Sequence, residues 1–290
     1  MTTLVLKLVL TPSVMVGATL AGRRWGGTVS GWLVGFPLTS GPLVLYLAID
    51  HGRRFAAHTA VGSLSGAIAE SAFCLGYSLG ARRGWRVALA TASACFAGTA
   101  AVLQTLPLGY GPPLLPLLAA VLVALAAGLW LLPRVAEPDA VPVRTPRWDL
   151  AARAAVATGV VVALAALAPR IGARLTGLLA VYPLYSAVLA AFAHRLQGSA
   201  AAIALLRGLL VGLFSFTAFY AVLPELLVHA GTAPAFAVAI AAALAVQAVS
   251  GARLLRWGRS TTASTTSSAR GSSGSISSSS RRRRSPPTGT

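Results

Sequence analysis

The sequence predicts an all-α fold: a polytopic transmembrane bundle of about nine helices in an inverted-repeat arrangement. Composition is the first observation behind this prediction. Of the 290 residues, 56% are apolar and only 10% are charged, whereas soluble domains average about 25% charged residues. The mean hydropathy of +0.74 agrees. The other two observations are recurring apolar stretches of membrane-spanning length and a match of the chain to itself at an offset of 146 positions.

Apolar stretches long enough to cross a bilayer recur along the chain, since a hydrocarbon core of about 30 Å takes about 20 helical residues. They cover residues 4–22, 29–49, 55–80, 86–106, 112–132, 150–169, 175–193, 199–223 and 233–252. The first stretch has two interpretations, because Lys7 and its small-residue end are also typical of a signal peptide. The apolar run continues past signal-peptide length to Arg23, which favours an uncleaved first helix.

The arginines predict how these helices are oriented. One set of alternate loops, taken together with residues 253–259, holds thirteen arginines, and the other set holds four. Positive residues collect on the cytoplasmic side of a membrane. We therefore expect a multi-pass protein of the cell (inner or plasma) membrane with its N-terminus outside and its C-terminus cytoplasmic. We attribute the net charge of +18 to arginines of the cytoplasmic loops, and we therefore expect no nucleic-acid partner.

Four regions follow from these patterns. Residues 1–132 form a first transmembrane repeat unit of five helices, 133–149 a Pro-rich cytoplasmic linker, and 150–257 a second unit of four helices. Residues 258–290 are rich in Ser, Thr and Arg without apolar periodicity, which predicts a disordered cytoplasmic tail. The arginine run 281–284 favours contact with anionic lipid headgroups. A tail that is merely solvated is the alternative.

The internal repeat is carried by glycine and proline, which backbone geometry selects. The offset pairs Gly26 with Gly172, Gly31 with Gly177, Pro37 with Pro183, Ser40 with Ser186, Gly52 with Gly198, Gly62 with Gly208 and Gly66 with Gly212. Because five crossings precede the second unit, equivalent helices run in opposite directions. Inverted repeats of this kind are the architecture of many secondary transporters, whose sites lie at the repeat interface near the midplane. Duplicated scaffolds and channels are the alternatives.

Proline interrupts equivalent helices of the two units and marks a candidate pathway. A proline within a helix frees the carbonyl four residues earlier, here at Leu33 and Leu179. The candidate pathway residues at these breaks are Pro37, Thr39, Ser40, Pro183, Tyr185 and Ser186. A plain kink, with the freed carbonyls bonded by the neighbouring hydroxyls, is the alternative.

Glycine pairs at four-residue spacing occur at equivalent positions of the spans 55–80 and 199–223. The pairs are Gly62 with Gly66 and Gly208 with Gly212. Since Gly-x-x-x-Gly lets helix backbones approach closely in lipid, we expect these two helices to form the central antiparallel pair.

Glu70 and Arg207 are the only charged residues well inside the expected spans. Placing an ionisable group within a membrane costs free energy, so such a residue is by default a candidate for a functional role. Each lies twelve residues from a cytoplasmic arginine, Arg82 or Arg195, so both are expected at one depth, where an ion pair can form. Three interpretations stay open: a static buried bridge, a proton or ion relay, and an Arg207 that only reaches toward the membrane surface.

The segment 177–223 and, more weakly, 31–77 resemble the GlpM-like family of small four-helix bacterial inner-membrane proteins. The resemblance rests on the steps Tyr182-Pro183 and Phe36-Pro37, Ala193-His194, Gly198 and Gly52, and Arg207-Gly208. The first unit departs from the pattern, with Val61 before Gly62. The whole chain is also similar to uncharacterised duplicated bacterial polytopic membrane proteins. The resemblance implies a bacterial inner membrane and supplies no mechanism.

Enzyme signatures are absent from the sequence, including His-Glu-x-x-His, Gly-x-Ser-x-Gly and the P-loop. Cys74 and Cys95 lie within apolar runs, as small buried residues do. We therefore expect no enzyme, no cofactor and no bound metal. The lipid bilayer is the expected partner, and the sequence predicts no oligomeric state. The predicted function is transporter-like movement of a small or lipid-like solute between two inverted halves. The alternative is a non-transporting scaffold or accessory subunit.

Overall fold

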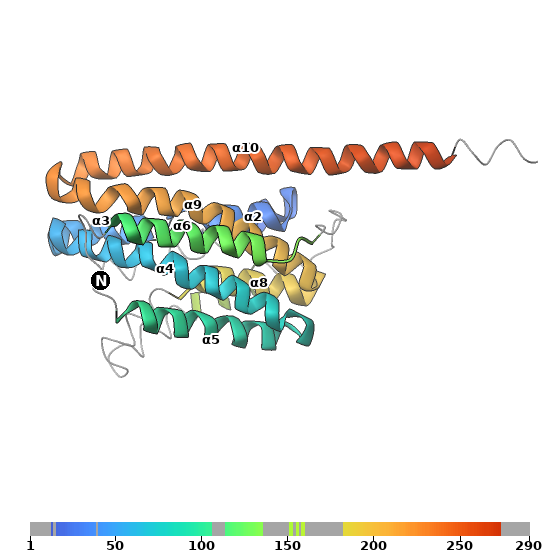
Figure 1. Cartoon of the computed structure of the whole chain (residues 1–290), viewed down its shortest axis with the longest axis horizontal. Coiled ribbons are helices and arrows are strands. Elements are labelled where there is room, and N and C mark those ends of the chain that lie inside the picture. The colour runs from blue at the N-terminus through green and yellow to red at the C-terminus, as the bar shows by residue number, and fades with distance from the viewer. Residues whose placement is uncertain are drawn as a thin grey trace, which may run out of the picture. The chain divides into compact units, whose positions relative to one another are not determined.

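The computed structural model describes residues 13, 16–38, 40–105, 114–135, 182–273 and three two-residue pieces between 151 and 159. Every regular element within this part of the chain is helical, which confirms the all-α class (Figure 1). The elements after the helical segment 16–25 are α2 (Gly27–Val34), α3 (Ser40–Asp50), α4 (Arg53–Gly80), the short 3-10 helix η1 (Ala81–Arg83), α5 (Trp85–Leu103), α6 (Leu114–Leu131), α8 (Leu184–Gln197), α9 (Ser199–His229) and α10 (Thr232–Ser273).

Four of these helices are long and apolar enough to cross a membrane: Trp85–Leu103, Leu114–Leu131, Ser199–His229 and the first part of α10, Thr232–Ala252. Several apolar helices compatible with an integral membrane protein are therefore present. The four differ in burial, since 72% of the most apolar window of α9 is buried and only 17% of that of α5. α9 thus belongs to the interior, whereas α5 presents apolar side chains outward, as a lipid-facing helix does.

α4 is 28 residues long and is not one of these four helices. Its two N-terminal arginines, its serines and Glu70 make it less apolar than they are. Half of its residues are nevertheless buried, among them Phe73 and Tyr77. A helix enclosed by other helices meets little lipid, so its side chains are selected for contacts within the protein.

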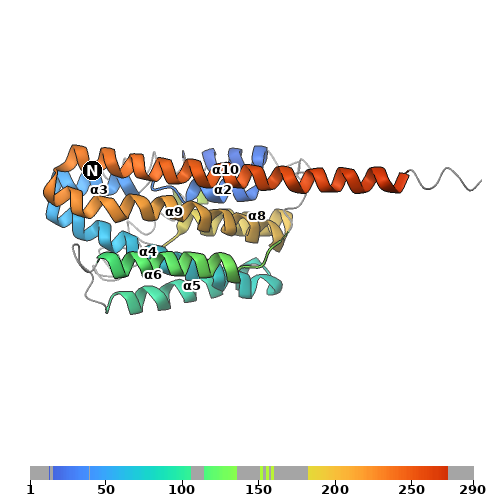
Figure 2. The same cartoon turned by 45° about the horizontal axis from the view of Figure 1, so that its top comes forward.

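Residues 1–248 form one compact body and residues 249–290 a second, and these bodies differ from the two predicted repeat units. Within the first body, α4 and α9 pack against each other and run in opposite directions (Figures 1 and 2). α5, α3 and α6 also pack on α4, while α2, α8 and α6 pack on α9. The expected central antiparallel pair, spans 55–80 and 199–223, corresponds to α4 and α9.

The expected span 29–49 is not a single helix, because α2 ends at Val34 and α3 begins at Ser40. The expected span 175–193 is described only from residue 182, and α8 begins just after Pro183. The start of the first span and most of the span 150–169 lie outside the described residues, as do residues 136–149 of the linker.

α10 continues to Ser273, beyond Gly258, where the composition predicts the start of a disordered tail. No proline stands between residues 258 and 273, and Ser and Thr are only moderately unfavourable in helices. A helix that has already begun can therefore extend through them. Residues 274–290, with the arginine run, lie outside the described part of the chain.

Candidate functional site

Glu70 faces a hydroxyl group from the other predicted repeat unit. It lies on α4, and the Oγ of Ser186 on α8 donates a hydrogen bond of 3.3 Å to its Oε1. Ser186 is almost fully buried and Glu70 is half-buried. One helical turn further along α4, Cys74 is completely buried. Two candidate residues chosen from the sequence, 116 positions apart, are thus brought together across the interior of the bundle.

The same face of α4 continues to a second polar contact. The hydroxyl of Tyr77 lies 3.2 Å from the carbonyl oxygen of Ala190 and 3.2 Å from Nδ1 of His194, both on α8. His194 follows the expected span 175–193 directly, and partial burial lowers the pKa of its imidazole. Glu70, Cys74, Tyr77, Ser186 and His194 form what we call the α4–α8 seam. Tyr77 and His194 were not singled out as site residues from the sequence.

Aromatic rings close one side of the α4–α8 seam. Tyr182 lies edge-on to Phe73 and to Phe96, with ring centroids 6.0 Å and 5.6 Å apart. Its hydroxyl is 2.9 Å from the Oγ of Ser93 on α5. These contacts join α4, α5 and the start of α8 and leave the polar groups of the seam in a largely apolar surrounding.

The expected ion pair between Glu70 and Arg207 is not formed, although both residues are described. Arg207 lies on α9, and its Nη1 donates hydrogen bonds to the carbonyl oxygens of Leu129 (3.1 Å) and Leu132 (2.7 Å). These carbonyls belong to the C-terminal end of α6, where a helix has no intrahelical donors left and its dipole favours a cation. The ion pair was one of three open interpretations, and it does not form because equal depth along two helices does not fix the direction in which each side chain points. Through these two hydrogen bonds, Arg207 instead holds the C-terminal end of α6 against α9.

The proline breaks are tight turns: Pro37 lies between α2 and α3, and Pro183 lies directly before α8. The N–H of Leu38 donates to the carbonyl of Phe36 (2.7 Å), and the N–H of Leu184 donates to that of Tyr182, also at 2.7 Å. Each proline is the central residue of its turn, and Pro183 has the backbone angles of an inverse γ-turn (φ −74°, ψ 63°).

The carbonyl of Leu33 accepts the N–H of Phe36 at 3.2 Å and is not left free by Pro37. The expectation that Pro37 frees the carbonyl of Leu33 is therefore wrong, because the helix ends before the proline. Leu179 lies outside the described residues, and so does Thr39. Tyr185 is partly buried against the hydrophobic core, next to Ser186.

Ser40 begins α3 and is half-buried. The hydroxyl of Tyr220, which is fully buried on α9, faces Ser40 and Ser63 but makes no hydrogen bond of acceptable geometry. Ser40 and Ser186 stand at equivalent positions of the repeat, and each lies near a buried polar side chain of the long helix beside it.

The glycine pairs do not meet each other across α4 and α9. A Cβ on Gly208 would overlap the backbone of Thr28, and one on Gly212 would overlap that of Trp32, so both glycines pack on α2. Gly62 is exposed with open space around it, and Gly66 is half-buried. The expectation that these glycines join α4 to α9 is therefore wrong. Larger side chains, such as Leu64 and Leu206, fill the centre of the first body.

The partner of the α9 glycines is a third Gly-x-x-x-Gly motif, Gly31 with Gly35, which was not predicted from the sequence. A Cβ on Gly31 would overlap the carbonyl of Leu205, and one on Gly35 would meet the backbone of Gly212. The signal was visible in the letters GWLVG at 31–35. It was overlooked because only Gly31 has a glycine at the equivalent position of the repeat.

Within the described residues, no three His, Cys, Asp or Glu side chains gather as a metal site requires, and Cys74 and Cys95 are free thiols. The polar groups of the α4–α8 seam can exchange protons and hydrogen-bond a small solute. Comparison of the chain with protein-family models, with curated proteins and with solved structures finds no match. The resemblance to the GlpM-like family stays a prediction.

Proposed function

We propose that this chain is a transporter-like membrane protein that moves a small or lipid-like solute by rocking two inverted halves, residues 1–132 and 150–257. The observation that carries the proposal is the hydrogen bond from Ser186 to Glu70, which joins a hydroxyl of one half to a carboxyl group of the other. The proposal includes a bacterial inner membrane, an N-terminus outside, and no catalysis.

The inverted arrangement is supported by equivalent local structure at the 146-residue offset. Gly52 and Gly198 both have positive φ, +88° and +94°, and each stands directly before a long helix, α4 or α9. The turns at Pro37 and Pro183 carry the same backbone hydrogen bond. A two-fold axis in the membrane plane makes equivalent helices antiparallel, and α4 and α9 run in that way.

Glu70 is the proposed coupling group. An ionised carboxylate within a membrane is costly unless it is paired, and the described partner of Glu70 is a neutral hydroxyl. A carboxyl group in that position can gain a proton when it faces one side of the membrane and release it when it faces the other. Tyr77 and His194 extend the polar seam from Glu70 toward the end of α8.

A non-transporting scaffold or accessory subunit is the second candidate, and one observation favours it. Ser186 and Cys74, which lie beside Glu70, are exposed by only 1% and 0%, as in a closed seam, and the cavity between the segment 16–25 and α2 is not lined by Glu70. A scaffold needs only a dry, closed seam in which Glu70 fixes the position of α8 against α4.

Cys74 provides a test that needs no known solute, because it lies one turn from Glu70. The variant Cys95→Ser keeps Cys74 as the only thiol. We expect a small membrane-impermeant methanethiosulfonate reagent to modify Cys74 in right-side-out and in inverted vesicles, at rates that differ between the two sides. Glu70→Gln should change the ratio of these rates, because it removes the proton-dependent step.

The control is Cys74→Ser, which keeps Cys95 and reports the reactivity of a thiol on α5. A Cys74 that stays unmodified from both sides, while denatured protein reacts fully, would favour the scaffold. The inverted arrangement has a separate check: cysteines replacing Arg53 and Arg195 should react from opposite sides of the membrane. Reaction from the same side would rule out the inverted halves.

A further inference from the structure

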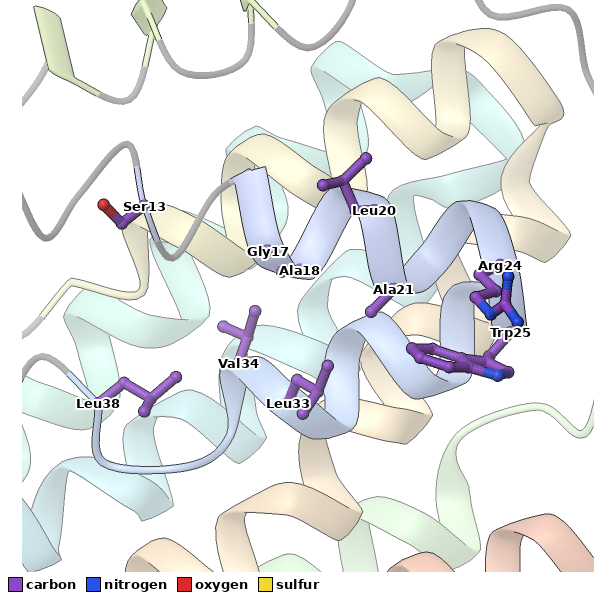
Figure 3. A pocket seen from close by; sticks show the side chains of 10 residues that line it. All are labelled: Ser13, Gly17, Ala18, Leu20, Ala21, Arg24, Trp25, Leu33, Val34 and Leu38. Atoms are coloured by element: carbon purple, nitrogen blue, oxygen red, sulfur yellow. The ribbon is translucent and has the colours of Figure 1, made fainter.

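An open cavity lies along the outside of α2, where the helical segment 16–25 runs beside it (Figure 3). Its volume is about 510 Å³, within the usual range for small-molecule sites. The lining residues that matter for its chemistry are Gly17, Arg24, Trp25, Leu33, Val34 and Leu38. We call this cavity the α2 groove.

The α2 groove is apolar along its length and cationic at one end. Leu33 and Val34 project from α2 toward the segment 16–25, and Arg24 and Trp25 stand together at one end, away from Leu38 (Figure 3). The guanidinium of Arg24 lies over the ring of Trp25, 5.5 Å from its centroid. Trp25 is more than half exposed, so the pair is accessible from outside the protein.

Contacts with neighbouring helices place this cationic end at one end of the bundle. Thr28, at the start of α2, touches Gly208 on α9, and the adjacent Arg207 bonds the C-terminal end of α6. The start of α2 therefore lies level with the end of an apolar helix long enough to cross the membrane. Arg and Trp side chains at this level meet lipid headgroups.

We propose that the α2 groove binds one acyl chain of an anionic phospholipid, with Arg24 holding the phosphate and Trp25 lying at the headgroup level. An apolar groove in a membrane protein is filled poorly by water and well by a hydrocarbon chain. A guanidinium at its membrane-surface end matches a phosphate in charge and in hydrogen-bonding geometry. This binding site is independent of solute transport and of Glu70.

The chain offers matched controls for both parts of this site. Arg86 also lies over a tryptophan, Trp85, at 5.3 Å, but it does not line the groove. Gly17 lines the groove, and Gly98 on α5 does not. At both positions an added Cβ meets no atom of the described residues within 4 Å. Arg24→Gln is therefore compared with Arg86→Gln, and Gly17→Leu with Gly98→Leu.

The full chain is reconstituted in nanodiscs of equal phosphatidylglycerol and phosphatidylcholine, and native mass spectrometry counts the lipids that stay bound after release. We expect the wild type to retain phosphatidylglycerol preferentially. Arg24→Gln should lower this preference about fivefold, the effect of one charge near a membrane surface, while Arg86→Gln should keep it. Gly17→Leu should reduce retention of both lipids because its side chain fills the groove, and Gly98→Leu should not.

The proposal is overturned if Arg24→Gln keeps the wild-type preference or if Arg86→Gln loses as much, because the preference would then come from general surface charge. It is equally overturned if Gly17→Leu retains as much lipid as Gly98→Leu. Thermal unfolding of all four variants separates lost binding from lost folding. The binding test succeeds or fails regardless of whether Cys74 is modified in the transport test.

Discussion

The contact between α4 and α8 and the contact between α9 and α3 stand at equivalent positions of the 146-residue offset, yet their chemistry differs. At the first contact, the carboxyl of Glu70 accepts a hydrogen bond from Ser186, and Tyr77 approaches His194. Ionisable groups thus follow one face of α4 from the interior toward the end of the bundle.

At the second contact, Phe216 takes the position of Glu70 and Tyr220 that of Cys74. The ring of Tyr220 packs on Phe216 and Phe219 with centroids 4.6 Å and 4.9 Å apart, while its hydroxyl faces Ser40. This region is an aromatic cluster whose polar groups are the hydroxyls of Tyr220, Ser40 and Ser63. The comparison indicates that the two contacts share their turns and glycines, whereas the carboxyl and imidazole groups occur only at the contact of α4 with α8.

The largest effect should come from glycine positions that the offset makes equivalent. We expect Gly208→Leu to lower the free energy of unfolding by about 3 kcal/mol, because the new side chain would overlap the backbone of α2 at Thr28. Gly62→Leu should cost far less, since open space surrounds Gly62 among the described residues. Thermal unfolding in detergent, followed by tryptophan fluorescence, measures both.

A small loss in Gly208→Leu would contradict the close packing of α2 on α9. An equally large loss in Gly62→Leu would mean that Gly62 is in close contact as well, and that the two equivalent glycine positions do not differ.

The second effect concerns Arg207, which bonds two carbonyls at the end of α6. Arg207→Leu should destabilise the protein by about 2 kcal/mol, because two part-buried carbonyl acceptors lose a charged donor. Arg195→Leu, at an exposed position on α8, is the control and should change little. The same unfolding measurement applies.

Combining Arg207→Leu with Glu70→Gln decides whether the two charges interact. Since they share no described partner, the two losses should add to within about 0.5 kcal/mol. A larger coupling energy would mean that Glu70 and Arg207 interact directly, which contradicts the structure.

The smallest effect distinguishes the two buried tyrosines. Tyr77→Phe removes a hydroxyl that lies within hydrogen-bond distance of Ala190 and His194, so we expect a loss of about 1 kcal/mol. Tyr220→Phe removes a hydroxyl without a hydrogen bond and should be neutral or slightly stabilising. Equal losses in the two variants would mean that the aromatic region holds a polar contact as strong as that of the α4–α8 seam.

The sequence predicts the long helices better than it predicts their contacts. Gly52 and Gly198 mark the starts of α4 and α9 because positive φ is a local requirement that glycine meets. The position of the break at Pro37 was predicted correctly, but its form was not, because a proline within an apolar run is equally compatible with a kinked helix and with a γ-turn between two helices.

The partners of Arg207 and of the α9 glycines could not be predicted in the same way. They depend on how one helix is rotated about its axis against another that is distant in the chain, such as α2 against α9. The spacing of residues along one helix does not determine that rotation. The Glu70–Ser186 contact was within reach of the sequence, since both residues were candidates for one pathway, but their direct hydrogen bond was not.

The glycine contact between α2 and α9 has a mechanical consequence. Where backbone touches backbone, no flexible side chain lies between the two helices to absorb a displacement, so α2 and α9 must move as a single rigid piece. α2 belongs to the first repeat unit in sequence and α9 to the second. In the proposed rocking of the two halves, α2 would therefore move with α9, and the γ-turn around Pro37 that joins α2 to the rest of the first half would have to change its conformation.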